Sequence, residues 1–405
     1  MNLTARDIFP GLDTQIPESR FNRVSKAVDS LFQKTLTRLE NGRPFIITGD
    51  IPAMWLRDST WQVAPLLNSN HPDVIQLLID LSKTQVELFL IDPFANAFNP
   101  APNGQCWHRD FPDQSPWVFE RKFELDSWAS VLYLARMITE KYDQIDHIDG
   151  SFKEALSLMI KLAKLEQTHD PESYIFKRNN DVPHDSLSHN GRGAPTAYTG
   201  MVYSAFRPSD DACMYGYLVP SNLFFLNELE QLPETLKSLE SQNLAKAIRT
   251  GVERFAIIDG KYAYEVDGHG NALFIDDANI PSLLTLPLLG CISPNDELYA
   301  ATREFILSEK NPYYFSGAKA AGIGSQHTPT GFVWPIAIAA QALTDPLQSK
   351  KLEALDLLEN TDAGTGSMHE AFNVNDDKEF TRSWFSWADM TYVQLVLDSI
   401  NYRSK

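Results

Sequence analysis

Two loop segments bring carboxylic acids next to residues that could control their ionisation. Segment 206–212 carries the adjacent acids Asp210 and Asp211, and the glycine-rich segment 364–372 carries Glu370 among aromatic residues. A general acid must stay protonated near neutral pH, and burial or a neighbouring carboxylate raises its pKa. A glutamate in a loop could hold water as a general base. Simpler explanations stay open, because a Ser-Asp pair commonly caps a helix and a lone glutamate is usually solvated.

Charged and aromatic side chains gather in further segments. Segment 48–59 packs an acid, a tryptophan and an Arg-Asp pair just before a predicted helix. Segments 265–268 and 324–327 offer hydrogen-bonding groups for hydroxyls, or else ordinary turn chemistry. Charges at a helix entry could line a cleft, but they are equally often caps or solvated ion pairs. Segment 117–126 poses that choice for Glu120, Arg121, Glu124 and Asp126.

The eight tryptophans lie mostly in or beside these loops. Sugar rings pack their C–H faces on aromatic side chains while carboxylates and amides bind the hydroxyls. Because aromatic residues are also prime core material, Trp128 and Trp334, on predicted helices, are interpreted as structural. The loops as a group therefore suit a neutral, polyhydroxylated ligand.

Composition and missing motifs exclude several function classes. The formal net charge of −18 and the lack of a basic block argue against nucleic acid. HExxH, CxxC, GxSxG and phosphate-loop patterns are missing from the sequence, and the acid pairs at 276–277 and 376–377 do not follow an EF-hand. We therefore expect no metal and no cofactor.

The cysteines and apolar segments bear on location. Three widely spaced cysteines, an odd number, fit a reducing compartment. The longest apolar stretches, such as 283–289, are far too short to cross a bilayer, and the N-terminal residues lack a signal-peptide pattern. These features predict a cytoplasmic protein without a membrane contact.

Helical periodicity dominates the chain. Apolar residues recur on one face from 18 to 39 and from 71 to 90, and a shorter helix is predicted at 58–67. Further helices are predicted at 126–141, 151–166, 219–231, 234–257, 294–308, 331–344, 346–359 and 383–400. Short strands are predicted at 45–48 and, as a hairpin, at 262–266 with 272–275.

Long irregular loops separate the predicted helices. Paired helices with functional loops gathered at one end suggest an all-α (α/α)₆ barrel, a toroid with short β-hairpins in its loops, formed by residues 1–405 as a single catalytic domain. A helical array in two domains is the alternative.

Three strings resemble glycoside hydrolase family 125. They are Gly49–Ser59 (GDIPAMWLRDS), Phe206–Asp211 (FRPSDD) and Met368–Phe372 (MHEAF), and supporting matches run in the same order from about residue 18 to residue 400. The resemblance implies an exo-acting α-mannosidase that prefers terminal α-1,6-linked mannose, inverts the anomeric configuration and needs no metal. It also implies the (α/α)₆ barrel, with a small mannose-containing oligosaccharide or N-glycan fragment as ligand.

The resemblance assigns the catalytic pair. The family's general acid falls on Asp210 and its general base on Glu370. Ala371 stands where the family pattern has serine, and segments 100–116 and 170–195 depart more, which affects the leaving-group side. The candidates for holding the terminal sugar are Asp50, Trp55, Arg57, Asp58, Arg121, Asp126, Arg207, Asp267 and His327.

The hypothesis makes a geometric prediction and has two rivals. Inversion needs room for a water, so the two carboxyl groups should lie roughly 6.5–9.5 Å apart, whereas about 5 Å would imply retention. A glycan-binding protein without turnover could keep the aromatic cleft. A glycoside phosphorylase would need basic groups beside the base, where His369 is the only one adjacent in sequence.

Overall fold

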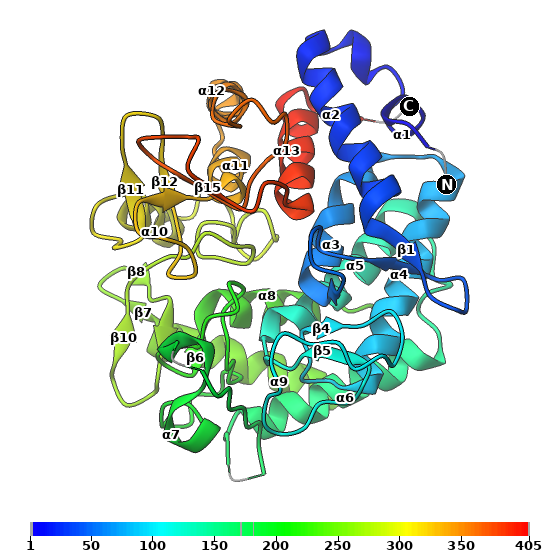
Figure 1. The fold of residues 1–405 in the computed structure, drawn as a ribbon. Helices are drawn as coiled ribbons and strands as arrows, with labels where there is room; N and C mark the ends of the chain where they lie inside the picture. The colour runs from blue at the N-terminus through cyan, green and yellow to red at the C-terminus, as the bar shows by residue number, and fades with distance from the viewer. Residues whose placement is uncertain (1–2, 171, 181, 404–405) are drawn as a thin grey trace.

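The computed structural model describes residues 3–170, 172–180 and 182–403. Its long helices form two concentric layers (Figure 1). The outer helices bury one face; α2, for example, buries Phe21, Val24 and Val28 at helical spacing. They are α2 (Glu18–Ser30), α4 (Pro72–Ile91), α6 (Gly150–Glu166), α9 (Leu239–Gly251), α10 (Glu297–Ile306) and α12 (Gln348–Asn360).

The inner helices are buried on nearly all sides, as expected for the centre of a toroid. They are α3 (Leu56–Val63), α5 (Leu125–Tyr142), α8 (Val219–Glu230), α11 (Pro335–Leu343) and α13 (Ser386–Ser399). Between α8 and α11 the ring is completed by a turn segment, 281–290, whose Leu289 carbonyl accepts a hydrogen bond from Asn227 of α8. The predicted (α/α)₆ toroid is confirmed, with an irregular sixth inner element.

The ring closes where the two ends of the chain meet. Helix α13 packs against α3, the first inner helix, and against α2, the first outer helix. Figure 1 shows α2 in blue beside α13 in red. One hydrophobic cluster extends from Ala5 to Tyr402.

Short antiparallel strands lead into several inner helices. Strands β3, β6 and β13 end next to the first residues of α3, α8 and α11, so the loops gather at the N-terminal ends of the inner ring. The strands are β1 (Leu36–Arg38), β2 (Pro44–Ile46), β3 (Met54–Trp55), β4 (Ala97–Phe98), β5 (Val118–Glu120), β6 (Tyr217–Leu218), β7 (Ile257–Ile258), β8 (Lys261–Tyr262), β9 (Glu265–Val266), β10 (Ala272–Leu273), β11 (Tyr314–Ser316), β12 (Ala321–Ile323), β13 (Phe332–Val333), β14 (Ala371–Asn373) and β15 (Phe380–Thr381). Two helices of four residues, α1 (Ala5–Ile8) and α7 (Ser188–Gly191), lie outside the ring pairs.

The helix predicted at 18–39 is wrong in its last third. Helix α2 ends at Ser30, a π-helical turn follows, and β1 then pairs with β2 across a turn at Asn41-Gly42. Asn-Gly is a strong hairpin signal because both residues tolerate positive φ, and Gly42 has φ +81°. The predicted hairpin at 262–275 is confirmed by the pairing of β9 with β10.

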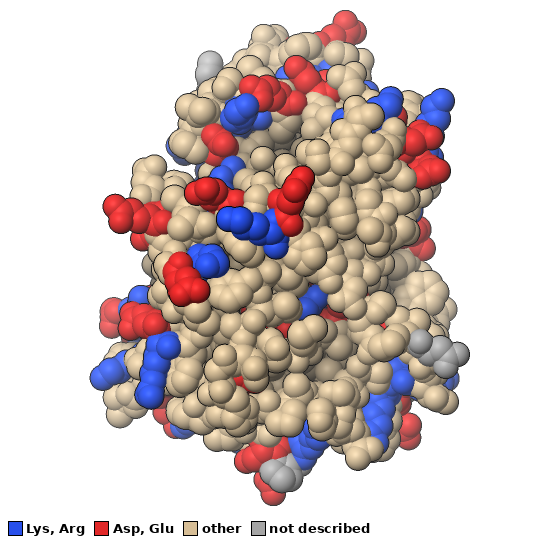
Figure 2. Space-filling model, turned by 90° about the vertical axis from the view of Figure 1, so that its left-hand side faces the viewer, with Lys and Arg blue, Asp and Glu red and all other residues tan. Residues whose placement is uncertain are grey.

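The outer surface carries charges of both signs. On the face in Figure 2, Lys, Arg, Asp and Glu side chains lie mainly near the edges, and a few charged atoms show in a hollow near its centre. No helix in the described part of the chain is long and apolar enough to span a membrane.

Candidate active site

A cavity of about 310 Å³ lies at the N-terminal ends of the inner elements. Every inner element contributes, because each is entered through a loop or strand that reaches this end of the ring. Its lining consists of Thr48, Ile51, Trp55, Arg57, Asp58, Trp107, His108, Glu120, Lys122, Arg178, Asp185, Pro208, Ser209, Asp210, Asn279, His327, Trp334, Glu370, Arg382, Phe385 and Trp387.

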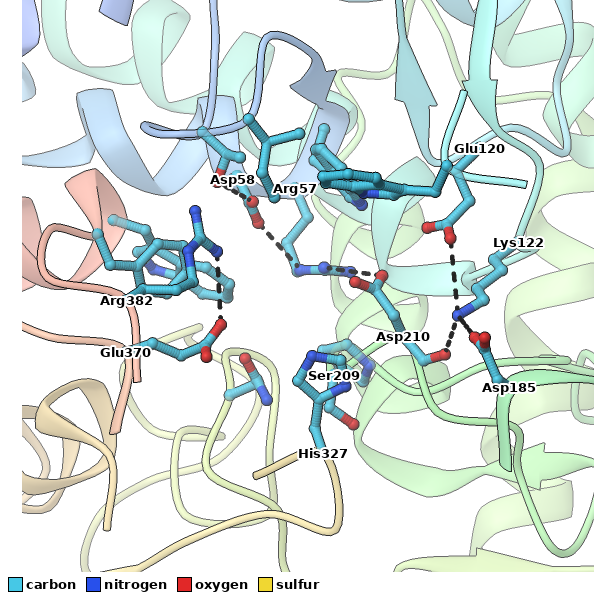
Figure 3. Close-up of a pocket in the computed structure, with 18 of the residues that line it drawn as sticks. Arg57, Asp58, Glu120, Lys122, Asp185, Ser209, Asp210, His327, Glu370 and Arg382 are labelled. Atoms are coloured by element: carbon cyan, nitrogen blue, oxygen red, sulfur yellow. Dashed lines mark hydrogen bonds and ion pairs between the residues drawn. The ribbon is translucent and has the colours of Figure 1, made fainter. Parts of the chain in front are cut away.

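Asp210 and Glu370 line this same cavity from opposite sides (Figure 3). Asp210 ends a tight turn in which its backbone N–H donates to the Arg207 carbonyl at 2.9 Å. Its φ of +66° lies in the left-handed region, which aspartate tolerates better than most residues. Arg207, which begins this turn, is held by an ion pair with Glu265 at 2.6 Å. The side chain of Asp210 is 24% exposed, toward the cavity.

Cations and an amide surround the Asp210 carboxylate. Arg57 lies 3.8 Å from its Oδ1, and the Asn96 side-chain amide donates to the same oxygen at 3.2 Å. Lys122 donates to the Asp210 carbonyl at 2.7 Å. Burial alone would raise the pKa of Asp210, but the charges of Lys122 and Arg57 outweigh it, and the pKa lies below its ordinary value. Asp210 alone therefore lacks the raised pKa that the sequence led us to expect of a general acid.

Glu124 lies behind Asp210, at the entry to α5. Its side chain has no exposed surface and pairs with Arg57, which also lies 3.2 Å from Asp126. Burial raises the pKa of Glu124 well above its ordinary value, and the negative charge of Asp210 adds to this effect. A carboxyl group that holds its proton more tightly than an ordinary glutamate is thus present on this side of the cavity, beside the predicted acid.

Glu370 has a simpler environment. Its Oε1 lies 3.4 Å from Arg382, whose guanidinium group also binds Asp50. The loop that carries Glu370 is held from α13, because the Met368 N–H donates to Asp389 at 2.7 Å. The neighbouring Ala371 is fully buried in β14, and its N–H donates to the Thr381 hydroxyl at 3.1 Å.

His327 faces the two carboxylates from the loop before α11. Its Nδ1 lies 3.6 Å from Asp211. Burial alone would lower the pKa of His327, but the hydrogen bond and charge of Asp211 outweigh it and raise the pKa to about 9. The imidazole is therefore positively charged near neutral pH.

The sequence-based candidates divide into two groups. The cavity is lined by both predicted catalytic residues and by four predicted sugar contacts, Trp55, Arg57, Asp58 and His327. The other five predicted contacts, Asp50, Arg121, Asp126, Arg207 and Asp267, are not among its lining residues.

Each of these five has another partner. Arg121 pairs with Asp92 at 2.7 Å. Asp267 closes its own turn by accepting hydrogen bonds from the backbone N–H groups of His269 and Asn271. Asp126 and Arg207 support cavity residues through Arg57 and through the turn of Asp210, and Asp50 binds Arg382.

Several lining residues were missed or interpreted as structural from the sequence. Trp334 is 2% exposed, consistent with its predicted core role, yet it borders the cavity. Lys122, Arg178 and Asp185 form a buried ion-pair network at its edge, joined by Lys122–Asp185 at 2.6 Å and Arg178–Asp185 at 2.9 Å. The sequence does not indicate that Lys122 belongs to an ion-pair network, because Lys122 and its partner Asp185 lie 63 positions apart.

Unpaired donors point to a polar ligand. Among the described residues, the indole Nε1 atoms of Trp55 and Trp387 and the side-chain Nδ2 of Asn279 are buried without a hydrogen-bond partner, and all three residues line the cavity. Buried donors of this kind are rare unless a ligand or water satisfies them. Within the described ranges, no group of His, Cys, Asp and Glu side chains is arranged to hold a metal ion.

The chain resembles known proteins over nearly its full length. Residues 12–397 match the profile of a family described as metal-independent alpha-mannosidase (GH125). A Streptococcus pneumoniae enzyme, solved as a non-productive complex with alpha-1,6-mannobiose in a study of metal-independent alpha mannosidases, is 39% identical with a TM-score of 0.93, covering 97% of this chain and 96% of that one. The meiotically up-regulated gene 157 protein of Schizosaccharomyces pombe is 38% identical, covering 93% of this chain and 81% of its own length.

More distant structures share only the fold. A bacterial glucoamylase in complex with acarbose is 11% identical with a TM-score of 0.55, covering 98% of this chain and 57% of that one.

Proposed function

Because this chain belongs to the GH125 family of metal-independent α-mannosidases, we propose that it releases terminal α-1,6-linked mannose with inversion of the anomeric configuration. The resemblance in the sequence motifs is thus confirmed at the level of the family. The finer proposal is carried by one observation: Asp210 and Glu370, 160 positions apart in sequence, face the same cavity from opposite walls.

The proposed reaction divides the work between these two carboxyl groups. Asp210 gives a proton to the glycosidic oxygen as the C1–O bond breaks. Glu370 accepts a proton from the water that attacks C1 from the opposite face. Arg57 and His327, both positively charged, stabilise negative charge that develops on the acid side as its proton leaves.

The cavity suits a terminal sugar. A volume of about 310 Å³ is near the lower end of the range for ligand pockets, about 300–1,000 Å³. Trp55, Trp334 and Trp387 provide aromatic surface, and the unpaired donors provide partners for hydroxyl oxygens. The complex of the bacterial relative with alpha-1,6-mannobiose supports the linkage. We propose a small mannose-containing oligosaccharide as the substrate.

Proton NMR of α-1,6-mannobiose hydrolysis in the presence of EDTA tests this proposal. We expect β-mannose as the first product, at the same rate with and without EDTA. Initial release of α-mannose would refute inversion. Binding of the disaccharide without hydrolysis would support the glycan-binding alternative, and a rate that depends on phosphate would support phosphorolysis.

A further inference from the structure

The predicted general acid has a second carboxyl group as its immediate neighbour. One side-chain amide, that of Asn96, donates to both carboxyl groups, at 3.3 Å to Glu124 Oε1 and 3.2 Å to Asp210 Oδ1. The two carboxyl groups thus lie within reach of a hydrogen bond to each other. Two carboxyl groups can be hydrogen-bonded to each other only if one of them carries a proton. Such a bond therefore requires at least one proton on the pair.

The surrounding charges require the same conclusion. Arg57 lies within 4 Å of four carboxyl groups, those of Asp58, Glu124, Asp126 and Asp210. Three of these have side chains exposed by 7% or less, so water cannot neutralise the excess negative charge. A buried carboxylate without sufficient positive charge becomes protonated instead.

The two carboxyl groups differ in their access to the cavity. Glu124 has no exposed side-chain surface, and Ser127 donates to its Oε2 at 3.1 Å. Asp210 borders the cavity and lies nearer to Lys122. The proton consequently rests on Glu124, where burial raises the pKa, and Asp210 is the member of the pair that can reach a substrate.

We propose that Glu124 and Asp210 act as one acid that shares a single proton, with Glu124 as the positioning residue that stores the proton and Asp210 as the catalytic residue that delivers it. This inference rests on the proposed function. The one shared proton passes from Glu124 to Asp210, and from Asp210 to the glycosidic oxygen, which keeps the bonding electron pair as the C1–O bond breaks. Both carboxyl groups end as anions beside Arg57.

The cycle closes with solvent protons. The attacking water leaves its hydroxyl on C1 and its proton on Glu370. Glu370 then releases that proton to solvent, and the Glu124–Asp210 pair takes one back. No oxidant, reductant or further reactant is needed.

The pH profile of Glu124→Gln tests the shared proton. The variant keeps a group of similar size but removes the stored proton, which leaves Asp210 under the charges of Lys122 and Arg57. We expect the alkaline limb of kcat for α-1,6-mannobiose to move down by at least about one pH unit and kcat at pH 7 to fall about 10–100-fold. Hydrolysis of 2,4-dinitrophenyl α-mannoside, whose leaving group needs no protonation, should change less than about threefold.

Glu228→Gln is the matched control. Glu228 is also buried and bound by an arginine, Arg136 at 2.8 Å, but it lies toward the opposite end of the toroid, near the C-terminus of α8. We expect its alkaline limb to stay in place even if its Tm falls. A Glu124→Gln enzyme with the wild-type pH profile would overturn the inference, and so would an equal loss on both substrates.

A second variant covers the case in which Glu124→Gln does not fold. Ser127→Ala removes a donor that favours ionised Glu124. The pair should then hold its proton more tightly, and the alkaline limb should move to higher pH. An unchanged or lowered limb would contradict the shared proton. Failure of the proposed function is distinguishable, because wild-type enzyme would then not hydrolyse mannobiose or Asp210→Asn would retain full activity.

Discussion

The two walls of the cavity differ in the balance between cations and carboxyl groups. On the Asp210 wall, Arg57, Lys122 and Arg178 are shared among seven carboxyl groups: Asp58, Asp110, Glu120, Glu124, Asp126, Asp185 and Asp210. On the Glu370 wall, the predicted base has Arg382 at 3.4 Å, with the aromatic side chains of Phe385 and Trp387 alongside. A wall with too few cations for its buried acids keeps a proton.

In the proposed mechanism, this difference lets Asp210 serve as the acid and Glu370 as the base in one small cavity. Residues adjacent to Asp210 in the sequence do not produce this difference between the walls. Asp211, which follows the acid directly, turns to His327, whereas Glu124, 86 positions away, contacts the acid. The ionisation of the site is therefore a property of the ring of helices, and the following predictions test each wall.

The largest effect is expected from removing either catalytic group. Asp210→Asn and Glu370→Gln should each lower kcat for α-1,6-mannobiose by about 10²–10⁴. On 2,4-dinitrophenyl α-mannoside, only Glu370→Gln should be severely impaired, because this leaving group departs without a proton while water still needs a base. Steady-state kinetics on both substrates measure this, and equal behaviour of the two variants would erase the distinction between the walls.

A smaller effect on kcat is expected from replacing Arg382, the cation on the Glu370 wall. Arg382→Gln removes the group that fixes Glu370 and should lower kcat about tenfold with little change in KM. Asp50→Asn also breaks the contact with Arg382 but leaves Glu370 paired, so its kcat should change less than about threefold. If Asp50→Asn lowered kcat more than Arg382→Gln, the main role of Arg382 would be to join the loop of Asp50 to the loop of Glu370, which would contradict its expected role of positioning Glu370.

The pH dependence of stability should report on Asp389, a buried acid behind the Glu370 wall. Burial raises the pKa of Asp389 to about 7 from 3.8. Because the folded chain holds this proton more tightly than the unfolded chain, stability is lost as pH rises from about 4 through about 7. Asp389→Asn, which keeps an acceptor for Met368, should match wild type at pH 4 and exceed its Tm by about 2–4 °C at pH 8. A Tm difference independent of pH would refute this.

The smallest effect is expected from His327. Its pKa is raised to about 9 by Asp211, so its charged form stabilises the fold fully below about 6.5, and this contribution is lost as pH rises through about 9. The imidazole is 37% exposed, and partly solvated pairs contribute little. His327→Gln should lower Tm by about 1–2 °C at pH 6 and not at pH 10. Differential scanning calorimetry at both pH values decides, and a larger loss at pH 10 would contradict it.

Much of the fold could be predicted, because one apolar face marks outer helices such as α2, and an apolar stretch of helical length marks inner helices such as α13. The π-helical turn and strand at 31–39 could not be predicted, because the apolar residues there continue the helical spacing up to the hairpin turn at Asn41-Gly42. The sixth inner element had no such signal, because 281–290 forms successive turns rather than a helix.

Residues of the candidate site could be predicted where a sequence motif contains them. They could not be predicted where their role depends on which way a side chain points. Glu124 has extended backbone angles, and between β5 and Glu124 the side chains point alternately to opposite sides. Glu120 and Lys122 reach the cavity, whereas Arg121 points to Asp92 and the ring of Phe94. Recognising this extended segment would have separated Arg121 from its neighbours. The raised pKa of Glu124 could not be predicted, because its surroundings come from three distant segments, at Arg57, Asn96 and Asp210.

The closure of the ring by α13 has a consequence for biosynthesis. A ribosome makes the Asp210 wall well before the Glu370 wall, and Arg382 meets Asp50 only after 332 further positions have been translated. Until α13 docks, a nascent chain therefore carries a half-site whose crowded carboxyl groups remain open to water. Hydrolytic competence should appear abruptly once α13 has been translated and has docked, with no graded gain before that point.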